Sequence, residues 1–266
     1  MFKDLFSLKG RVALVTGGSR GIGRMIAAGF LAQGAARVYI SARKAGPCEA
    51  TAQELTAEYD GECIALPIDI STMAGIELLA TELKKREPKL DILVNNAGAA
   101  WGAEFDEFPE SGWDKVMNLN LKTPFFLTQA LAAPLRAAAS AERPAKVINV
   151  ASIDGIFVNP METYSYAASK SGLIHLTRRM ATKLIKEHIN VTAIAPGAFK
   201  SDMNRAARDH ADEVAERVPA RRVGTDEDMA GVAIYLASRA GDYVVGNTIA
   251  VDGGVVYANA GLEIAG

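Results

Sequence analysis

A tyrosine and a lysine one helical turn apart are the residues of this sequence best suited to acid–base chemistry. Tyr166 and Lys170 lie four positions apart, so on a helix they share one face. A free tyrosine has a pKa near ~10, and lowering it to ~7 requires about 4 kcal/mol of preference for the phenolate. One ammonium group at ~4 Å, in an effective dielectric of ~20, supplies about that much. We therefore expect Lys170 to acidify Tyr166, whereas Tyr164 has only Ala168 at the equivalent position.

A glycine-rich turn follows the first apolar run of the chain, in the segment Thr16-Gly17-Gly18-Ser19-Arg20-Gly21-Ile22-Gly23. Such a turn lets backbone N–H groups approach a pyrophosphate at the N-terminus of the following helix. The spacing of its glycines differs from the general G-x-G-x-x-G fingerprint, and a tight turn can use glycine without binding any ligand. Its position directly after the first predicted strand nevertheless favours a bound dinucleotide.

The end of the second apolar run indicates which dinucleotide is bound. An NAD site places an acidic residue ~20 positions beyond the glycine turn, where it binds ribose hydroxyls. Ala42 stands nineteen positions after Gly23, and Arg43 follows it. A guanidinium there can pair with a 2′-phosphate, and Arg20 can flank the same phosphate. Either arginine alone is consistent with a solvated surface residue, but together, with the acid missing, they favour NADP(H).

Taken together, the motifs of the chain resemble those of the short-chain dehydrogenase/reductase family. The resemblance runs from about Leu8 to Gly254. The motifs occur in the family's order: Thr16-Gly17-x-x-x-Gly21-x-Gly23, Asn95-Asn96-Ala97-Gly98, Asn120, Ser152, Tyr166-x-x-x-Lys170 and Pro196-Gly197. Tyr-x-x-x-Lys alone is common by chance, but the joint occurrence of these motifs at these spacings is specific.

The resemblance implies a role for each catalytic candidate. Tyr166 is the expected general acid for the carbonyl oxygen, and Lys170 is expected to lower its pKa and to bind the nicotinamide ribose. Ser152 is expected to hydrogen-bond the substrate carbonyl and orient it. Asn120, rather than the nearby Asn118, has the family spacing from the preceding motif. It is expected to hold a water molecule that links the lysine to a proton relay.

The resemblance also assigns a larger set of residues to the cofactor, most of them at strand ends and in the turns that follow. The set comprises Gly17, Ser19, Arg20, Gly21, Ile22, Gly23, Arg43, Asp69, Ile70, Asn96, Ala97, Gly98, Tyr166, Lys170, Pro196, Gly197, Phe199 and Ser201. Asp69 and Ile70 resemble adenine contacts. Residues 196–201 resemble the segment that fixes the nicotinamide amide and the pyrophosphate, with Ser201 where the family more often has threonine.

Seven short apolar runs and the helix-like stretches between them would position these residues. The runs lie at 11–16, 38–41, 63–66, 91–95, 146–150, 190–194 and 248–251, and helix-like stretches include 22–33, 49–59, 73–86, 112–136 and 165–187. Runs of nearly continuous hydrophobicity are typical of parallel strands buried on both faces. The alternation predicts an α/β, Rossmann-type, doubly wound and mostly parallel seven-stranded sheet with helices on both faces. We expect residues 1–266 to form a single dinucleotide-binding and catalytic domain, with a charged lid at about 200–222.

Composition argues against several classes of function. The chain has 266 residues, of which 49% are hydrophobic and 23% charged, and its formal net charge is −2. This balance offers no basic field for nucleic acid or a membrane surface. No uncharged apolar stretch reaches the ~18 residues of a membrane span, and the N-terminus has no signal-peptide pattern, so a cytoplasmic protein is expected. The two cysteines and three histidines lack metal-ligand spacing, so no metal is expected.

The substrate is less constrained than the reaction. The stretches 95–102, 111–120, 140–145 and 195–199 resemble bacterial NADPH-dependent 3-oxoacyl reductases of the rhamnolipid-associated type. Trp101, Met161, Phe199 and Met203 could line an apolar pocket for an acyl tail. The mixed charges of residues 183–187 argue against docking of an acyl carrier protein, which leaves an acyl-CoA, a 3-oxo ester or a small ketone open.

Three functions follow as hypotheses. The first is reduction of a 3-oxoacyl thioester, a β-keto ester or a related ketone. The second is a dehydrogenase of a sugar, polyol, steroid or other small alcohol. The third is a non-catalytic dinucleotide-sensing protein, against which the complete catalytic set argues. The stretches 112–136 and 165–187 resemble the family's dimer interface, so a homodimer or homotetramer is expected, and the tail at 255–266 could close over a neighbouring subunit's site.

Overall fold

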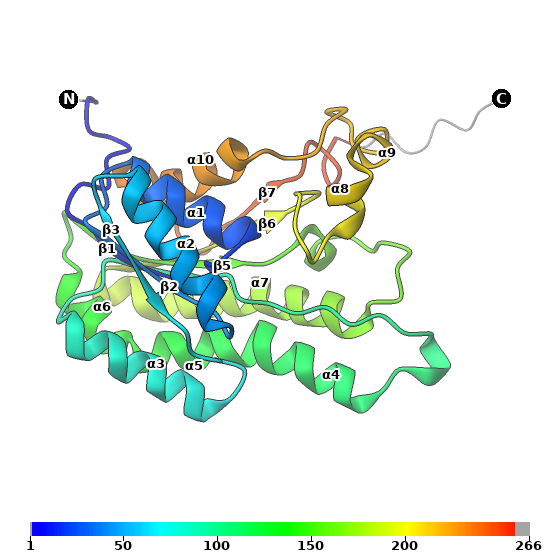
Figure 1. The fold of residues 1–266 in the computed structure, drawn as a ribbon, viewed down its shortest axis with the longest axis horizontal. Coiled ribbons are helices and arrows are strands. Elements are labelled where there is room, and N and C mark those ends of the chain that lie inside the picture. The colour runs from blue at the N-terminus through cyan, green and yellow to red at the C-terminus, as the bar shows by residue number, and fades with distance from the viewer. Residues whose placement is uncertain (1, 259–266) are drawn as a thin grey trace.

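The computed structural model describes residues 2–258, whose seven strands form one parallel sheet (Figure 1). The strands are β1 (Val12–Thr16), β2 (Arg37–Ser41), β3 (Glu62–Leu66), β4 (Ile92–Asn95), β5 (Ala145–Val150), β6 (Ile189–Pro196) and β7 (Thr248–Val251). Their order across the sheet is β3-β2-β1-β4-β5-β6-β7, so the connections reverse direction between β1 and β4. The predicted doubly wound fold is confirmed. Most of the tail expected over a neighbouring subunit, residues 259–266, lies outside the described residues.

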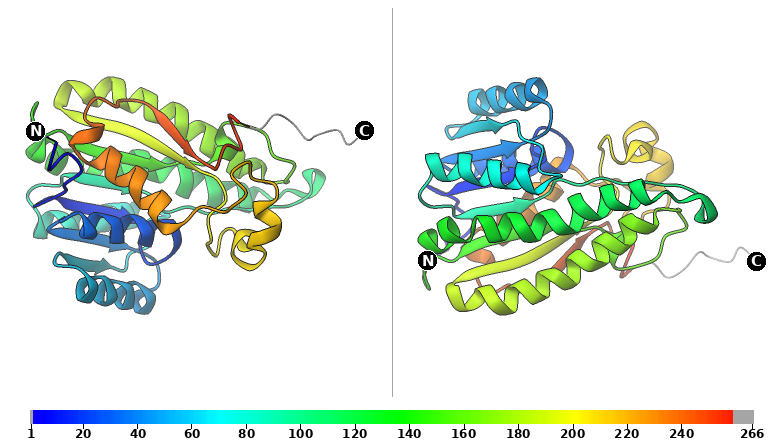
Figure 2. Two further views of the ribbon diagram at one scale, coloured as in Figure 1. Left: turned by 90° about the horizontal axis from the view of Figure 1, so that it is seen from above. Right: turned by 90° about the horizontal axis from the view of Figure 1, so that it is seen from below.

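Helices cover both faces of the sheet (Figures 1 and 2). One face carries α1 (Gly21–Ala32), α2 (Ala45–Glu58) and α10 (Asp226–Ala237), and the other carries α3 (Met73–Arg86), α4 (Glu110–Met117), α5 (Thr123–Ala130), α6 (Ala132–Ala138) and α7 (Tyr164–Leu184). The side chains of successive residues in each strand point to opposite faces of the sheet. Along β1, Val15 packs in the same core cluster as Phe30 of α1, whereas Leu14 packs in the cluster that contains Leu79 of α3.

The stretch predicted as one helix over 112–136 is interrupted twice. After α4, residues Asn118–Lys122 form a π-helical turn (η2), and a second break at Leu131 separates α5 from α6. Both breaks precede a proline by a few residues. Pro124 and Pro134 have no N–H to donate to the carbonyl one turn earlier, so a regular helix cannot continue there. The first break places Asn120 inside the π-helical turn, where it faces the ends of the neighbouring strands.

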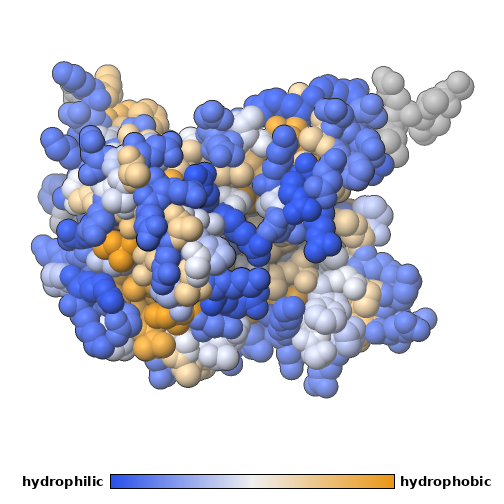
Figure 3. Space-filling view, in the orientation of Figure 1, coloured by the Kyte–Doolittle hydropathy of each residue, from blue (hydrophilic) through white to orange (hydrophobic). Residues whose placement is uncertain are grey.

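The charged segment 200–222 lies beyond the carboxyl ends of the strands (Figure 1). It contains two short helices, α8 (Arg205–Asp209) and α9 (Ala211–Ala215), and its visible surface is mostly hydrophilic (Figure 3). The expected lid stays a prediction, and residues 200–222 are called the lid below. Among the helices described, none is long and apolar enough to cross a bilayer.

Candidate active site

Tyr166 and Lys170 lie together near the start of α7, at the carboxyl end of β5. The Lys170 ammonium lies over the face of the Tyr166 ring, 5.5 Å from its centroid. Lys170 is only 4% exposed, and its Nζ donates a hydrogen bond of 2.7 Å to the carbonyl of Val150, the last residue of β5. This bond fixes the ammonium relative to Ser152, which lies two residues further along. The predicted pairing of phenol and ammonium is therefore present.

The protonation states of this pair differ from the sequence-based prediction. Burial raises the pKa of Tyr166 to about 12, against a lowering by its hydrogen bond with the Ser152 side chain and a further increase from the charge of Asp154. Burial also lowers the pKa of Lys170 to about 8, against an increase from Asp154. The expectation that Lys170 alone acidifies the phenol is wrong, because burial outweighs the other influences of this chain. Tyr166 is thus a protonated phenol at neutral pH, which is the form needed to donate a proton.

Ser152 joins the pair from the turn that follows β5. The residue is 7% exposed, and its Oγ accepts a 3.1 Å hydrogen bond from the backbone N–H of Asp154. That bond holds the hydroxyl in place without using its proton. A serine hydroxyl and an ammonium group therefore lie near a protonated phenol, an arrangement that can bind and protonate a carbonyl oxygen.

Asn120 ties the loop after β4 to α7. Its Oδ1 accepts from the backbone N–H of Ala99 at 2.8 Å, and its Nδ2 donates to the Ala99 carbonyl at 2.9 Å and to Ser169 Oγ at 3.0 Å. A Cβ added to Gly98 would lie 3.3 Å from Asn120 Oδ1 and 3.8 Å from Lys170 Nζ. The family resemblance implied that Asn120 lies near the lysine, but no local pattern indicated this amide pairing.

The glycine turn packs tightly against the end of β4. Gly17 and Gly21 have φ values of +67° and +52°, a left-handed conformation that favours glycine. Asn96 Nδ2 donates to the carbonyls of Thr16 and Gly17 at 2.8 and 3.2 Å. A Cβ added to Gly23 would lie 2.3 Å from the Gly17 carbonyl oxygen, so no side chain fits at this position. The turn therefore keeps its backbone open at the N-terminus of α1.

The N-terminus of α1 has the features of an anion-binding site. No side chain caps its first turn, and that turn contains no acidic residue. Free N–H groups and the helix dipole then favour a negative group such as a pyrophosphate. The neighbouring residues lock the turn in position: the Ser19 carbonyl accepts from Thr51 Oγ1 at 2.9 Å, and Ile22 packs against the core. The residues present thus fit a dinucleotide.

The two arginines expected at a 2′-phosphate have different surroundings. Arg43 lies exposed just beyond the end of β2. Arg20 is also exposed, but it forms an ion pair with Asp202 at the start of the lid. A Cβ added to Gly21 would lie 3.3 Å from the Cβ of Ser201, so the lid begins directly beside the glycine turn. The Arg20–Asp202 contact spans 182 positions, and no local pattern in the sequence indicated it.

The remaining cofactor candidates also lie at the carboxyl edge of the sheet. Asp69 is exposed after β3, where its Oδ1 accepts from the N–H of Ser71 at 3.0 Å. Ile70 is buried, and its carbonyl accepts from Thr123 Oγ1 at 2.9 Å. Asn96 and Ala97 both donate a backbone hydrogen bond to Thr16 Oγ1, at 2.9 and 3.0 Å. These contacts join the ends of β1 and β4, and they tie the segment after β3 to the start of α5.

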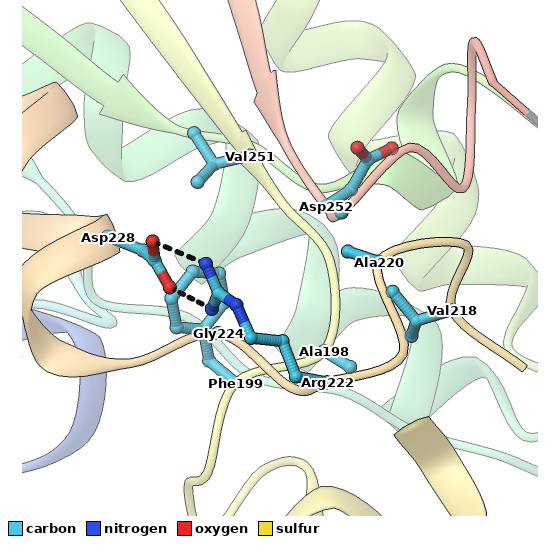
Figure 4. Close-up of a pocket in the computed structure, with 10 residues that line it drawn as sticks. Ala198, Phe199, Val218, Ala220, Arg222, Gly224, Asp228, Val251 and Asp252 are labelled. Carbon is cyan, nitrogen blue, oxygen red and sulfur yellow. Dashed lines mark hydrogen bonds and ion pairs between the residues drawn. The ribbon is translucent and has the colours of Figure 1, made fainter. Parts of the chain in front are cut away.

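The segment after β6 anchors the lid. Pro196 is the last residue of β6, and the N–H of Gly197 donates to the Val251 carbonyl at 2.9 Å. Phe199 is 2% exposed, and a Cβ added to Gly224 would lie 2.4 Å from its ring. Figure 4 shows this ring beside the ion pair of Arg222 and Asp228, in a pocket below the lid that Val251 and Asp252 also line.

The four residues expected to line an acyl pocket differ in their exposure. Phe199 packs under the lid, and the Trp101 ring packs on Gly112, where an added Cβ would lie 2.7 Å from it. Met161 and Met203 are instead exposed, by 62% and 52%. Of the four, these two methionines are the most exposed. Among residues 2–258, no cluster of His, Cys, Asp and Glu could hold a metal ion.

Comparison with known proteins places this geometry in context. A family model described as enoyl-(acyl carrier protein) reductase matches residues 17–256. A rhamnolipids biosynthesis 3-oxoacyl-(acyl-carrier-protein) reductase of Pseudomonas aeruginosa is 50% identical over 254 residues, which cover 94% of this chain and 97% of that protein. A 2-dehydro-3-deoxy-D-gluconate 5-dehydrogenase of Escherichia coli is 40% identical over 257 residues, covering 96% and 98%. A solved structure, the Pseudomonas aeruginosa RhlG/NADP active-site complex, matches with a TM-score of 0.91 and 49% identity over 95% of this chain and 98% of that one.

Proposed function

Because this chain belongs to the short-chain dehydrogenase/reductase family and is an NADP(H)-dependent oxidoreductase, we propose that it reduces the ketone of a 3-oxoacyl thioester or β-keto ester to a secondary alcohol. One observation carries the proposal: the protonated phenol of Tyr166 lies beside the Ser152 hydroxyl and the Lys170 ammonium. A carbonyl oxygen bound there would meet a hydrogen-bond donor and a proton donor at once. General acid assistance of this kind contributes a factor of about 10²–10⁴.

Each catalytic residue has a separate task in this proposal. Ser152 would donate its hydroxyl proton in a hydrogen bond that orients the substrate carbonyl. Tyr166 transfers its phenolic proton to the same oxygen. Lys170, held by the Val150 carbonyl, stabilises the phenolate that remains and binds the nicotinamide ribose. Asn120 lies near this pair, since a Cβ added to Gly98 would approach both Asn120 Oδ1 and Lys170 Nζ, and it would hold the water of a proton relay.

The cofactor residues have equally distinct tasks. NADPH, when bound, supplies the hydride. The uncapped N-terminus of α1 and the turn from Gly17 to Gly23 would hold the pyrophosphate, with Arg20 and Arg43 on the 2′-phosphate. Asp69 and Ile70 would contact the adenine. Asn96, Ala97 and Gly98 would lie along the cofactor, and residues 196–201 would hold the nicotinamide end.

The loop before α7 favours an acyl substrate over a sugar acid. Val158 and Met161 are 95% and 62% exposed on this loop. Residues 156–163 include Glu162 but no lysine or arginine, so this loop offers no counter-charge to a carboxylate. Met203, at the start of the lid, adds a further exposed apolar side chain. An acyl chain could bury these groups, whereas a sugar acid would leave them in contact with water.

A screen of NADPH oxidation tests the proposal directly. The substrates are 3-oxoacyl-CoA thioesters, β-keto esters, small ketones and keto sugar acids, each also assayed with NADH. We expect turnover with acyl substrates and NADPH. Turnover confined to sugar acids would instead support the dehydrogenase alternative. Cofactor binding with no turnover at all would favour a sensor protein.

A matched pair of variants tests the catalytic assignment. Tyr166→Phe should lose at least ~10²-fold in rate, because it removes the proton donor. Tyr164→Phe makes the same chemical change two residues away, where the hydroxyl bonds to Glu162 at 3.0 Å, and should retain activity. Equal rates in the Tyr166→Phe and parent enzymes would reject the assignment.

We also propose that the chain forms a homodimer or homotetramer through α4, α5 and α7. Trp113 on α4 and Phe125 on α5 are 41% and 38% exposed, and an interface between subunits would bury both aromatic side chains. Sedimentation of the parent protein and of a Phe125→Glu variant measures the assembly. The variant should dissociate to smaller species, and an unchanged oligomer would remove this helix from the interface.

A further inference from the structure

Ser169 is a buried serine of α7 to which the proposed mechanism assigns no task. It directly precedes Lys170 in the sequence and has no exposed surface. Its Oγ donates a hydrogen bond of 2.8 Å to the backbone carbonyl of Tyr166 and accepts one of 3.0 Å from Asn120 Nδ2. The hydroxyl therefore connects Asn120 with the helical turn that carries the catalytic tyrosine and lysine.

The direction of these bonds determines how the Asn120 amide is oriented. The Tyr166 carbonyl uses the Ser169 proton, so toward Asn120 the hydroxyl can only accept. Asn120 therefore turns its Nδ2 group to Ser169 and its Oδ1 to the backbone N–H of Ala99, which donates to it at 2.8 Å. In a flipped amide, Oδ1 would face the Ser169 oxygen and Nδ2 would face the Ala99 N–H, so like groups would meet at both contacts.

Water has no access to the contact between Ser169 and Asn120. Both side chains are buried, and η2 packs closely on α7, since a Cβ added to Gly172 would lie 3.1 Å from Leu121 Cδ2. Loss of the hydroxyl would leave one N–H of the Asn120 amide without an acceptor, and an unpaired donor is costly where water cannot replace its partner. The amide would then lose its preferred orientation.

The orientation of Asn120 affects the site through the loop after β4. The amide makes two hydrogen bonds with the backbone of Ala99. Asn120 Oδ1 and Lys170 Nζ also border the same space beside Gly98, where an added Cβ would lie 3.3 and 3.8 Å from them. The water of the proposed relay would lie between these two groups, so its position depends on the amide.

We propose that Ser169 is a positioning residue of the reaction, which orients the Asn120 amide and thereby holds the loop after β4 and the proton relay in place beside Tyr166 and Lys170. This inference rests on the proposed function, since the relay serves the same tyrosine and lysine. Ser169 needs no contact with substrate or cofactor in this role. It acts through the amide, so its effect depends on the presence of Asn120.

The variant Ser169→Ala removes the hydroxyl and little else. Ser165→Ala is the matched control, because Ser165 is equally buried one turn earlier on the same helix and its Oγ has no hydrogen-bond partner among residues 2–258. In Ser169→Ala, exchange of the Ala99 N–H with deuterium should be about 2- to 10-fold faster and kcat should fall by a similar factor. The KM for the ketone should stay within about 2-fold, because the relay acts on proton transfer rather than on binding.

Two measurements test this, and only one of them needs a substrate. Deuterium exchange is followed by mass spectrometry with fragmentation that resolves the Ala99 amide. Rates of ketone reduction are compared among the parent enzyme, Ser169→Ala, Asn120→Ala and the double variant. The double variant should be no slower than Asn120→Ala alone, because the serine acts only through the amide.

The outcomes separate this inference from the proposed function. Unchanged exchange at Ala99 in Ser169→Ala, or an equal increase in Ser165→Ala, overturns the inference whether or not the enzyme is active. Faster exchange confined to Ser169→Ala, in a protein whose parent reduces no ketone, supports the orienting role and rejects the proposed function. Faster exchange with an unchanged kcat, or a double variant slower than Asn120→Ala, shows that Ser169 does not act on the reaction through the amide, and the proposal then fails.

Discussion

Replacement of Asp202 by asparagine should tighten the binding of NADPH. In the structure Arg20 forms an ion pair with Asp202 of the lid, so the same guanidinium cannot approach a 2′-phosphate without leaving its partner. The side chains of Arg20 and Asp202 are 70% and 46% exposed, and exposed pairs contribute about 0.2–1 kcal/mol. Removal of this competition should therefore lower the Kd for NADPH by about 1.4- to 5-fold.

The assay is a titration of protein fluorescence with NADPH and with NADH at fixed ionic strength. Arg20→Ala should weaken NADPH binding, and the double variant with Asp202→Asn should bind no more tightly than Arg20→Ala alone. Asp209→Asn is the matched control, because Asp209 pairs with Arg208 but not with Arg20. Weaker NADPH binding in Asp202→Asn, or the same gain for NADH, would refute the competition between the lid carboxylate and the 2′-phosphate.

Three further predictions concern the scaffold of the site. Gly17→Ala should weaken NADPH binding at least ~10-fold in the same titration, because φ is +67° there and a Cβ would lie 2.9 Å from Asn96 Nδ2. Lys170→Met should raise the free energy of unfolding near pH 7 by about 3 kcal/mol, since the pKa of Lys170 is lowered from 10.5 to about 8 by burial. This gain should shrink in urea titrations as pH rises from about 8 to 10.5, where the unfolded chain binds the extra proton. Asp91→Ala should lower the free energy of unfolding, measured in urea, by about 3–5 kcal/mol, because the buried Arg11 loses its carboxylate partner. It should leave kcat unchanged, because this pair lies at the opposite end of the sheet from the site.

The strands could be predicted to within a few residues because each is a short apolar run, and most of them are buried on both faces. The site could be predicted where local spacing determines geometry, as for Tyr166 and Lys170 on one helix face. Contacts made by distant segments could not be predicted. The Arg20–Asp202 ion pair and the bonds from Asn120 to Ala99 and Ser169 depend on how the chain folds back on itself.

Helix interruptions were missed for a different reason. The apolar periodicity of 112–136 continues through Pro124 and Pro134, but a proline removes a backbone donor whatever the pattern around it. The break at residues 118–122 is the one that matters for function. It changes the direction of the chain at Asn120, so that the amide reaches Ala99. Pro124 was the signal in the sequence for this break, because a proline inside a predicted helix removes a backbone donor.

The protonation states show why spacing alone could not predict the chemistry of the site. A lysine four positions from a tyrosine implies attraction between ammonium and phenolate, but burial penalises both charged forms, and here it dominates. With a pKa of about 12, conversion of Tyr166 to its phenolate at pH ~7 costs about 7 kcal/mol. A reduction begins from the neutral phenol, so the free energy of forming the phenolate is required only as the proton is transferred. An oxidation at the same pH needs the phenolate at the start, so positive charge close to the phenol must first lower that free energy. The burial that keeps Tyr166 protonated also makes it a weaker acid, so the nearby Lys170 ammonium must stabilise the phenolate as the proton leaves.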